Sequence, residues 1–162
     1  MAKKKVPAWR VSLTAAENAK AVLPVLSRSY FAEGRDAAAG DLAEDDLHRF
    51  RLATKRFRYT LELFQPCYPA GLDQRLAQLR QIQQYLGEIN DCRTAAQLIR
   101  GLRPARSKQP SAVFAFLERR AAERVTRFHE YWTKTFDAPG REQNWVDYLI
   151  RYAGRMTARR KH

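Results

Sequence analysis

Apolar residues recur at helical spacing along most of the chain, and glycine and proline separate the segments. The clearest stripe predicts a long helix over residues 72–100; it consists of Leu72, Leu76, Leu79, Ile82, Leu86 and Ile89. Four further helices are predicted, and no strand. Long amphipathic helices joined by short turns favour an all-α fold, an antiparallel helical bundle of about four long helices plus a short C-terminal helix.

Local signals set the expected boundaries of these helices. Thr14 and Glu17 have the spacing of a capping box, so the first helix should begin there, and Gly34 should end it. Asp41 and Glu44 form a weaker capping box before the second helix, which should stop at Pro66. Residues 103–110 should be a basic loop, with Ser111 capping the fourth helix to about residue 136 and Asn144 capping the last one. The expected organisation is a basic tail (1–13), a helical bundle (14–136) and a C-terminal turn, helix and basic tail (137–162).

The second predicted helix carries an unusual arrangement of charge. On a helical wheel its core face gathers Phe50, Ala53, Phe57, Leu61 and Phe64, and a second apolar side gathers Leu52, Tyr59 and Leu63. Between these sides lies a basic strip of four residues, His48, Arg51, Lys55 and Arg58. A solvated charged face normally lies opposite a single apolar stripe. The double flank therefore predicts that the basic strip lines a groove or seam between helices.

Basic residues also align on two other predicted helices. The fourth helix places Arg120, Arg124, Arg127 and Tyr131 on one side, and the third helix places Arg75, Arg93 and Arg100 on a common side. If the three sets face one another, they form a positively charged furrow that attracts anions. The alternative is that these arginines pair with acids on the surface, as Arg58 could with Glu62 at helical spacing. Asn90 falls within the core stripe of the third helix, where its polar side chain would need partners.

Composition indicates the charge of the expected partner. The chain has 162 residues, with 30 Lys and Arg against 17 Asp and Glu, giving a formal net charge of +13. Such an imbalance repels itself in a compact state and favours a negative partner. Most of the basic residues are arginines, whose planar fork donates two parallel hydrogen bonds to a phosphate. Cys67 and Cys92 lack the spacing of a zinc site or a disulfide framework, so neither metal nor cofactor is expected.

Two segments resemble the signatures of the CHAD domain, the conserved histidine α-helical domain. Residues 48–59 resemble its basic helix, with His48 at the histidine place and Arg51, Lys55, Arg56 and Arg58 at the basic places. Residues 86–91 are similar to its second signature, and the resemblance spans about residues 42–136. It implies an all-α fold, binding of inorganic polyphosphate in a basic channel and association with polyphosphate granules in bacteria. It does not imply an enzymatic activity.

The resemblance is to one half of that family's usual domain, which contains two helical-bundle halves. This chain looks most like the C-terminal half, so one wall of the channel would be missing. We therefore expect two chains to pair as a symmetric homodimer that rebuilds the channel.

The leading functional prediction is thus non-catalytic polyphosphate binding through His48, Arg51, Lys55, Arg56, Arg58, Arg93, Arg120, Arg124 and Arg127. A nonspecific nucleic-acid-binding protein is the main alternative, supported by charge alone. An enzyme acting on polyphosphate or phosphate esters is a third, although no metal-ligand spacing or phosphate-binding glycine loop is present. No apolar run approaches membrane-spanning length, so we expect a cytoplasmic protein with no membrane partner.

Overall fold

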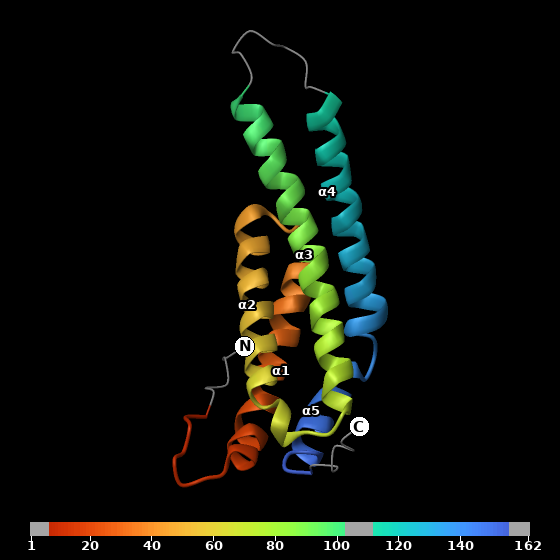
Figure 1. The fold of residues 1–162 in the computed structure, drawn as a ribbon. Helices are drawn as coiled ribbons and strands as arrows, with labels where there is room; N and C mark the ends of the chain where they lie inside the picture. The colour runs from red at the N-terminus through yellow and green to blue at the C-terminus, as the bar shows by residue number, and fades with distance from the viewer. Residues whose placement is uncertain (1–6, 103–111, 156–162) are drawn as a thin grey trace, which may run out of the picture.

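The computed structural model describes residues 7–102 and 112–155, and these residues form helices and connecting turns without a strand (Figure 1). The elements are α1 (Ala15–Ala39), α2 (Glu44–Leu63), a 3₁₀ helix (Gln65–Cys67), α3 (Gly71–Gly101), α4 (Ala112–Tyr131), a π-helical turn (Trp132–Phe136) and α5 (Arg141–Arg151). The all-α prediction is confirmed. The predicted basic loop and the Ser111 cap lie outside the described residues.

Helix α1 begins as predicted but ends later. The Thr14 hydroxyl accepts from the Glu17 amide at 3.2 Å, and the Thr14 amide donates to the Glu17 carboxylate at 2.8 Å, which completes the capping box. The prediction that Gly34 ends this helix is wrong, because α1 runs to Ala39. Gly34 instead provides space: a Cβ there would lie 1.9 Å from Cη2 of Trp132. The glycine allows close helix packing and does not mark a C-cap.

Two other predicted caps are also wrong. Helix α2 begins at Glu44 after Ala43, which makes no side-chain cap, so Asp41 does not open it with a capping box. Helix α5 begins at Arg141 after Gly140, whose φ of 81° places it in the left-handed region that favours glycine. Asn144 therefore lies inside α5. In both places the backbone turn sets the start of the helix without help from a capping side chain.

Aromatic side chains fill the core where the helices meet. Phe31 of α1 stacks on Phe136 with ring centroids 4.9 Å apart, and Trp132 and Trp145 pack around this pair. The predicted core faces of α2 and α3 are both confirmed, because all eleven residues of these two faces are buried. Asn90 differs from its prediction, since it is partly exposed and lies outside the buried stripe.

Helices α3 and α4 pack side by side and extend beyond the ends of α1 and α2 (Figure 1). This extension, which we call the arm, includes the C-terminal end of α3 and the N-terminal end of α4. Its exposed large apolar residues are Leu98, Leu102, Val113 and Phe116. Helix α3 contacts both α2 and α4 and lies between them (Figure 1).

Candidate functional site

The basic strip of α2 lies beside α3. The Arg58 guanidinium donates from Nε to the side-chain oxygen of Gln83 on α3 at 2.9 Å. Its Nη1 donates to Glu62 at 2.6 Å, and the guanidinium also stacks over the Tyr59 ring. Glu62 in turn pairs with Arg80 of α3 at 3.1 Å. The predicted pairing of Arg58 with Glu62 is therefore present, and it anchors this end of the strip to the α2–α3 seam.

The middle of the strip is open. Arg51 and Lys55 are partly exposed, His48 is exposed, and none of the three has an ion-pair partner among the described residues. Arg51 and Lys55 lie four residues apart, or about 6 Å of helix rise. Two uncompensated cations thus stand next to each other along one edge of α2, a geometry suited to successive phosphate groups of an extended chain.

The second apolar side of α2 does not pack against another helix. Leu52, Tyr59 and Leu63 are exposed. The expected double flank is therefore wrong in one respect: the strip is bordered by the core on one side and by an exposed apolar edge on the other. The strip still lies at a seam, because α3 approaches it through Gln83 and Arg80. Side chains of Arg58, Arg80, Gln83 and Gln84 line a shallow groove there.

Two other predicted site residues have different surroundings. The Arg93 guanidinium donates to the backbone carbonyls of Leu42 and Asp41, so it holds the segment that connects α1 to α2. Arg56 lies on the opposite side of α2, where it lines a groove toward α1 together with the acids Glu33, Asp36 and Asp46. Acids near Arg56 reduce its attraction for an anion, and the carbonyls occupy the hydrogen-bonding groups of Arg93.

Some basic residues of α4 are paired with an acid and others are not. Arg124 pairs with Glu88 of α3, with 2.8 Å between Nε and Oε2. Arg120 and Arg127 are exposed, and the described residues offer neither of them an ion-pair partner. Arg120 lies near the Phe116 ring, 6.0 Å from its centroid. These two cations flank Arg124 by about one helical turn on each side.

The remaining arginines of the α3 set are engaged within the fold. Arg75 donates to the side-chain oxygen of Asn144 at 2.8 Å and stacks over the Tyr148 ring, 3.7 Å from its centroid. Burial lowers the pKa of Arg75. Arg100 stacks over the Phe114 ring at 4.9 Å. The shared side predicted for Arg75 and Arg100 therefore serves helix packing.

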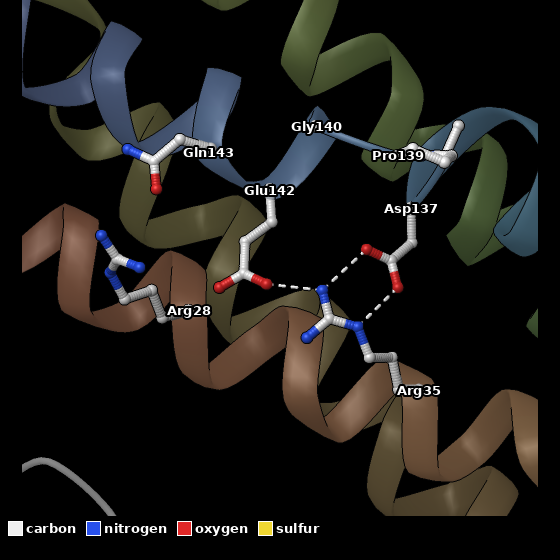
Figure 2. A pocket seen from close by; sticks show the side chains of 8 residues that line it. Arg28, Arg35, Asp137, Pro139, Gly140, Glu142 and Gln143 are labelled. Atoms are coloured by element: carbon white, nitrogen blue, oxygen red, sulfur yellow. Dashed lines mark hydrogen bonds and ion pairs between the residues drawn. The ribbon is translucent and has the colours of Figure 1, made fainter.

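A separate charged pocket joins α1 to the start of α5 (Figure 2). Arg35 binds Asp137 through two hydrogen bonds of 2.7 and 2.8 Å and reaches Glu142 at 2.5 Å. The hydrogen bond to Asp137 is the main cause that raises the pKa of Arg35 above its usual value. Two carboxylates surround this guanidinium, so we assign it to holding the α1–α5 contact.

Sequence reasoning missed the contribution of α3 to this surface. Arg80, Gln83 and Gln84 line the groove beside Arg58, yet none was singled out from the sequence. Their signal was their spacing: they lie three to seven residues before Gly87, with Gln83 beside the apolar stripe and Arg80 and Gln84 further toward solvent. The stripe could identify this flank of the helix, but only the α2–α3 packing shows that it borders the basic strip.

The fold and the basic strip define the class of protein: an all-helical bundle that carries a row of cations along the seam between two helices. A comparison with protein-family models then matches residues 2–100, more than half of the chain, to the CHAD domain. The chain belongs to the CHAD domain family. The match includes α1, α2 and nearly all of α3 but not α4, so it begins and ends earlier than the resemblance noted from the sequence.

The other comparisons add no relative. No curated protein and no solved structure matches the chain. The CHAD domain is generally a binding domain associated with polyphosphate. Within residues 7–102 and 112–155, no helix is both long enough and apolar enough to cross a bilayer. The same residues contain no group of three or more His, Cys, Asp or Glu side chains that could hold a metal ion.

Proposed function

We propose that this protein binds inorganic polyphosphate, without catalysing a reaction on it, through the α2 strip and the exposed arginines of α4. The observation that carries the proposal is the pair Arg51 and Lys55, two neighbouring cations with no acid partner among the described residues, in a chain of the CHAD family. His48 extends the same row by one turn. Charge-assisted hydrogen bonds to phosphate oxygens supply the affinity.

The surroundings of each cation suggest how the predicted site residues divide. Arg51, Lys55 and His48 on α2, with Arg120 and Arg127 on α4, form the proposed contact set. Arg58 and Arg124, which are already paired with glutamates, frame this set and shape it. Arg56 and Arg93 are left out of the proposed contact set, because three acids line the same groove as Arg56 and the guanidinium of Arg93 already donates to two backbone carbonyls.

The direct test removes the unpaired cations of α2. Arg51→Ala combined with Lys55→Ala should lose binding to long-chain polyphosphate in a pull-down and by titration calorimetry, with helicity by circular dichroism unchanged. The matched control is Arg28→Ala combined with Arg151→Ala, which removes two exposed arginines elsewhere on the fold. Binding that survives the first pair of changes, or falls equally with both pairs, would show that the α2 strip is misassigned.

Competition separates polyphosphate from nucleic acid. Unlabelled duplex DNA and single-stranded DNA, matched in phosphate concentration, should compete poorly with labelled polyphosphate. The core aromatics Phe50 and Phe57 are buried and offer no surface on which bases could stack, whereas Tyr59 and Phe116 are exposed, so the competition decides between the two polyanions. Equal competition would favour the nucleic-acid alternative. Release of orthophosphate from polyphosphate in the presence of magnesium would contradict the non-catalytic part of the proposal.

We also propose that two chains pair through the arm. Leu98 of α3, Leu102 directly after that helix, and Val113 and Phe116 of α4 expose apolar surface at neighbouring levels of the arm. Two arms packed together would bury these residues in a four-helix arrangement, and a second copy supplies an equal apolar surface. Sedimentation should show a dimer at micromolar concentration that Leu98→Glu with Phe116→Glu converts to a monomer. A wild-type monomer would contradict the pairing and leave polyphosphate binding to be judged separately.

Association with polyphosphate granules in the cytoplasm follows from the same chemistry. A fluorescent fusion should co-localise with granules in a bacterial host that accumulates polyphosphate, and the Arg51→Ala, Lys55→Ala fusion should be diffuse. A wild-type fusion that stays diffuse while granules are present would contradict this part of the proposal.

A further inference from the structure

Gly87 lies in the middle of the 31-residue helix α3, where a glycine destabilises the helix relative to alanine. Glycine in such a position usually serves close packing. Two other glycines of this fold do so: a Cβ on Gly34 would overlap Trp132, and one on Gly71 would lie 2.8 Å from Tyr148. A Cβ on Gly87, by contrast, would have no atom within 4 Å of it.

The remaining glycines have local explanations that do not apply to Gly87. Gly140 and Gly154 have φ values of 81° and 78°, which other residues rarely adopt. Gly40 follows the last residue of α1, and Gly101 is the last residue of α3. Gly87 alone combines a mid-helix position, ordinary helical geometry and open space. Packing within the described fold therefore does not explain why no side chain is present at this position.

The position of Gly87 relative to the basic residues of α2 follows from the contacts across the seam. Arg58 of α2 bonds Gln83 of α3, and the two helices run antiparallel, since Glu44 pairs with Gln97 and Glu62 with Arg80. Gly87 lies four residues after Gln83, and in an antiparallel pair this corresponds to Thr54, four residues before Arg58. Gly87 is therefore at a level between those of Arg51 and Lys55, the two unpaired cations of the strip.

The residue that follows Gly87 faces α4. This residue, Glu88, is paired with Arg124 at 2.8 Å, so its negative charge is compensated at this level. Arg120 and Arg127 lie about one turn to either side of Arg124. Helix α3 lies between α2 and α4 (Figure 1), so at the level of Gly87 it separates the unpaired cations of α2 from those of α4.

We propose that Gly87 is the point at which an extended phosphate chain crosses α3, lying against the helix backbone between Arg51 and Lys55 on one side and the α4 arginines on the other. This inference rests on the proposed function. Helix side chains extend about 5–6 Å from the axis, whereas the Cα atoms lie about 2.3 Å from it. A chain that crosses at a glycine therefore approaches about 3 Å closer, within reach of basic side chains from both neighbouring helices.

The prediction is a loss of affinity that grows with the size of the residue at this position. Gly87→Ala should keep helicity, raise the melting temperature and weaken polyphosphate binding about 3-fold or less. Gly87→Leu and Gly87→Phe should weaken polyphosphate binding about 10-fold or more, because the phosphate chain can then contact only one set of cations. A tenfold change in affinity corresponds to about 1.4 kcal/mol. The Cβ of each new residue would meet no atom within 4 Å in the free protein.

Gly101→Phe is the matched control, because a Cβ at Gly101 also meets nothing within 4 Å and the residue lies on the same helix, away from the α2 strip. It should bind as the wild type does, and sedimentation should show the same assembly state as the wild type, because Gly101 lies in the arm. Affinity unchanged in Gly87→Phe, or reduced equally in Gly87→Ala and Gly87→Phe, would overturn the crossing point. A wild-type protein that binds no polyphosphate refutes the proposed function itself. Binding that is lost in the Arg51→Ala, Lys55→Ala variant but kept in Gly87→Phe refutes the crossing alone.

Discussion

The dependence of polyphosphate affinity on salt should reveal how many cations contact the chain. When a protein neutralises phosphates, the counterions condensed on the polymer are released, and the logarithm of the affinity falls linearly with the logarithm of the salt concentration. For single-stranded nucleic acids the slope is about −0.7 for each phosphate neutralised. Polyphosphate is likewise a flexible single chain with closely spaced charges, so we apply the same coefficient to it.

The proposed contact set gives the number of contacts expected. The unpaired lysine and arginines of the proposed contact set are Arg51, Lys55, Arg120 and Arg127. Four contacts predict a slope of about −3, and therefore about a 50-fold loss of affinity between 50 and 200 mM salt. If the whole net charge of +13 acted without a defined site, the slope would approach about −9. The two models differ enough to be separated by a simple titration.

The measurement is a binding titration with polyphosphate of one chain length at four or more sodium chloride concentrations. A slope near −3 that becomes shallower by about 1.4 in the Arg51→Ala, Lys55→Ala variant supports a local site. Slopes that stay the same in this variant, or a wild-type slope near −9, refute the assignment of contacts to these side chains.

Three further predictions concern the fold that presents the site. Gly34→Ala should cost about 3 kcal/mol or more by urea denaturation, because its new methyl group would overlap Trp132; a cost below about 1 kcal/mol would contradict the tight contact. Thr54→Val should cost about 2 kcal/mol in the same assay, because the Tyr30 hydroxyl, 3.1 Å from Thr54, would lose its partner; no loss would contradict that bond. Arg35→Ala should cost only about 1 kcal/mol, because 47% of its side chain is exposed and solvent screens its ion pairs; a cost above about 3 kcal/mol would contradict the screening.

Periodicity predicted the helices of this fold well because each one buries a continuous apolar stripe. The stripe from Leu72 to Ile89 is buried along its whole length, and the core face of α2 is buried too. Helix ends were less predictable, since they depend on tertiary contacts that sequence spacing does not contain. Gly34 has the spacing of a helix stop, yet Trp132, nearly a hundred residues away, is the reason for the glycine.

The basic site was only partly predictable for a related reason. Helical spacing placed Arg51, Lys55 and Arg58 on one side of α2, and the structure shows that side at the seam with α3. Spacing could not show that Arg93 would be engaged by carbonyls of the α1–α2 connection, because that contact joins segments about fifty residues apart. Nor could it show which arginines of α4 meet an acid, since Glu88 belongs to another helix.

The arginines of this protein therefore fall into two groups whose members look alike in the sequence. One group is engaged within the fold: Arg35 with two carboxylates, Arg75 with Asn144, Arg93 with carbonyls. These contacts fix the helices but leave few guanidinium donors for a ligand. The other group, exemplified by Arg51, keeps its charge uncompensated. Because self-repulsion among such residues opposes folding, a bound polyanion should stabilise the protein most when it contacts this second group, and least when those residues have been neutralised.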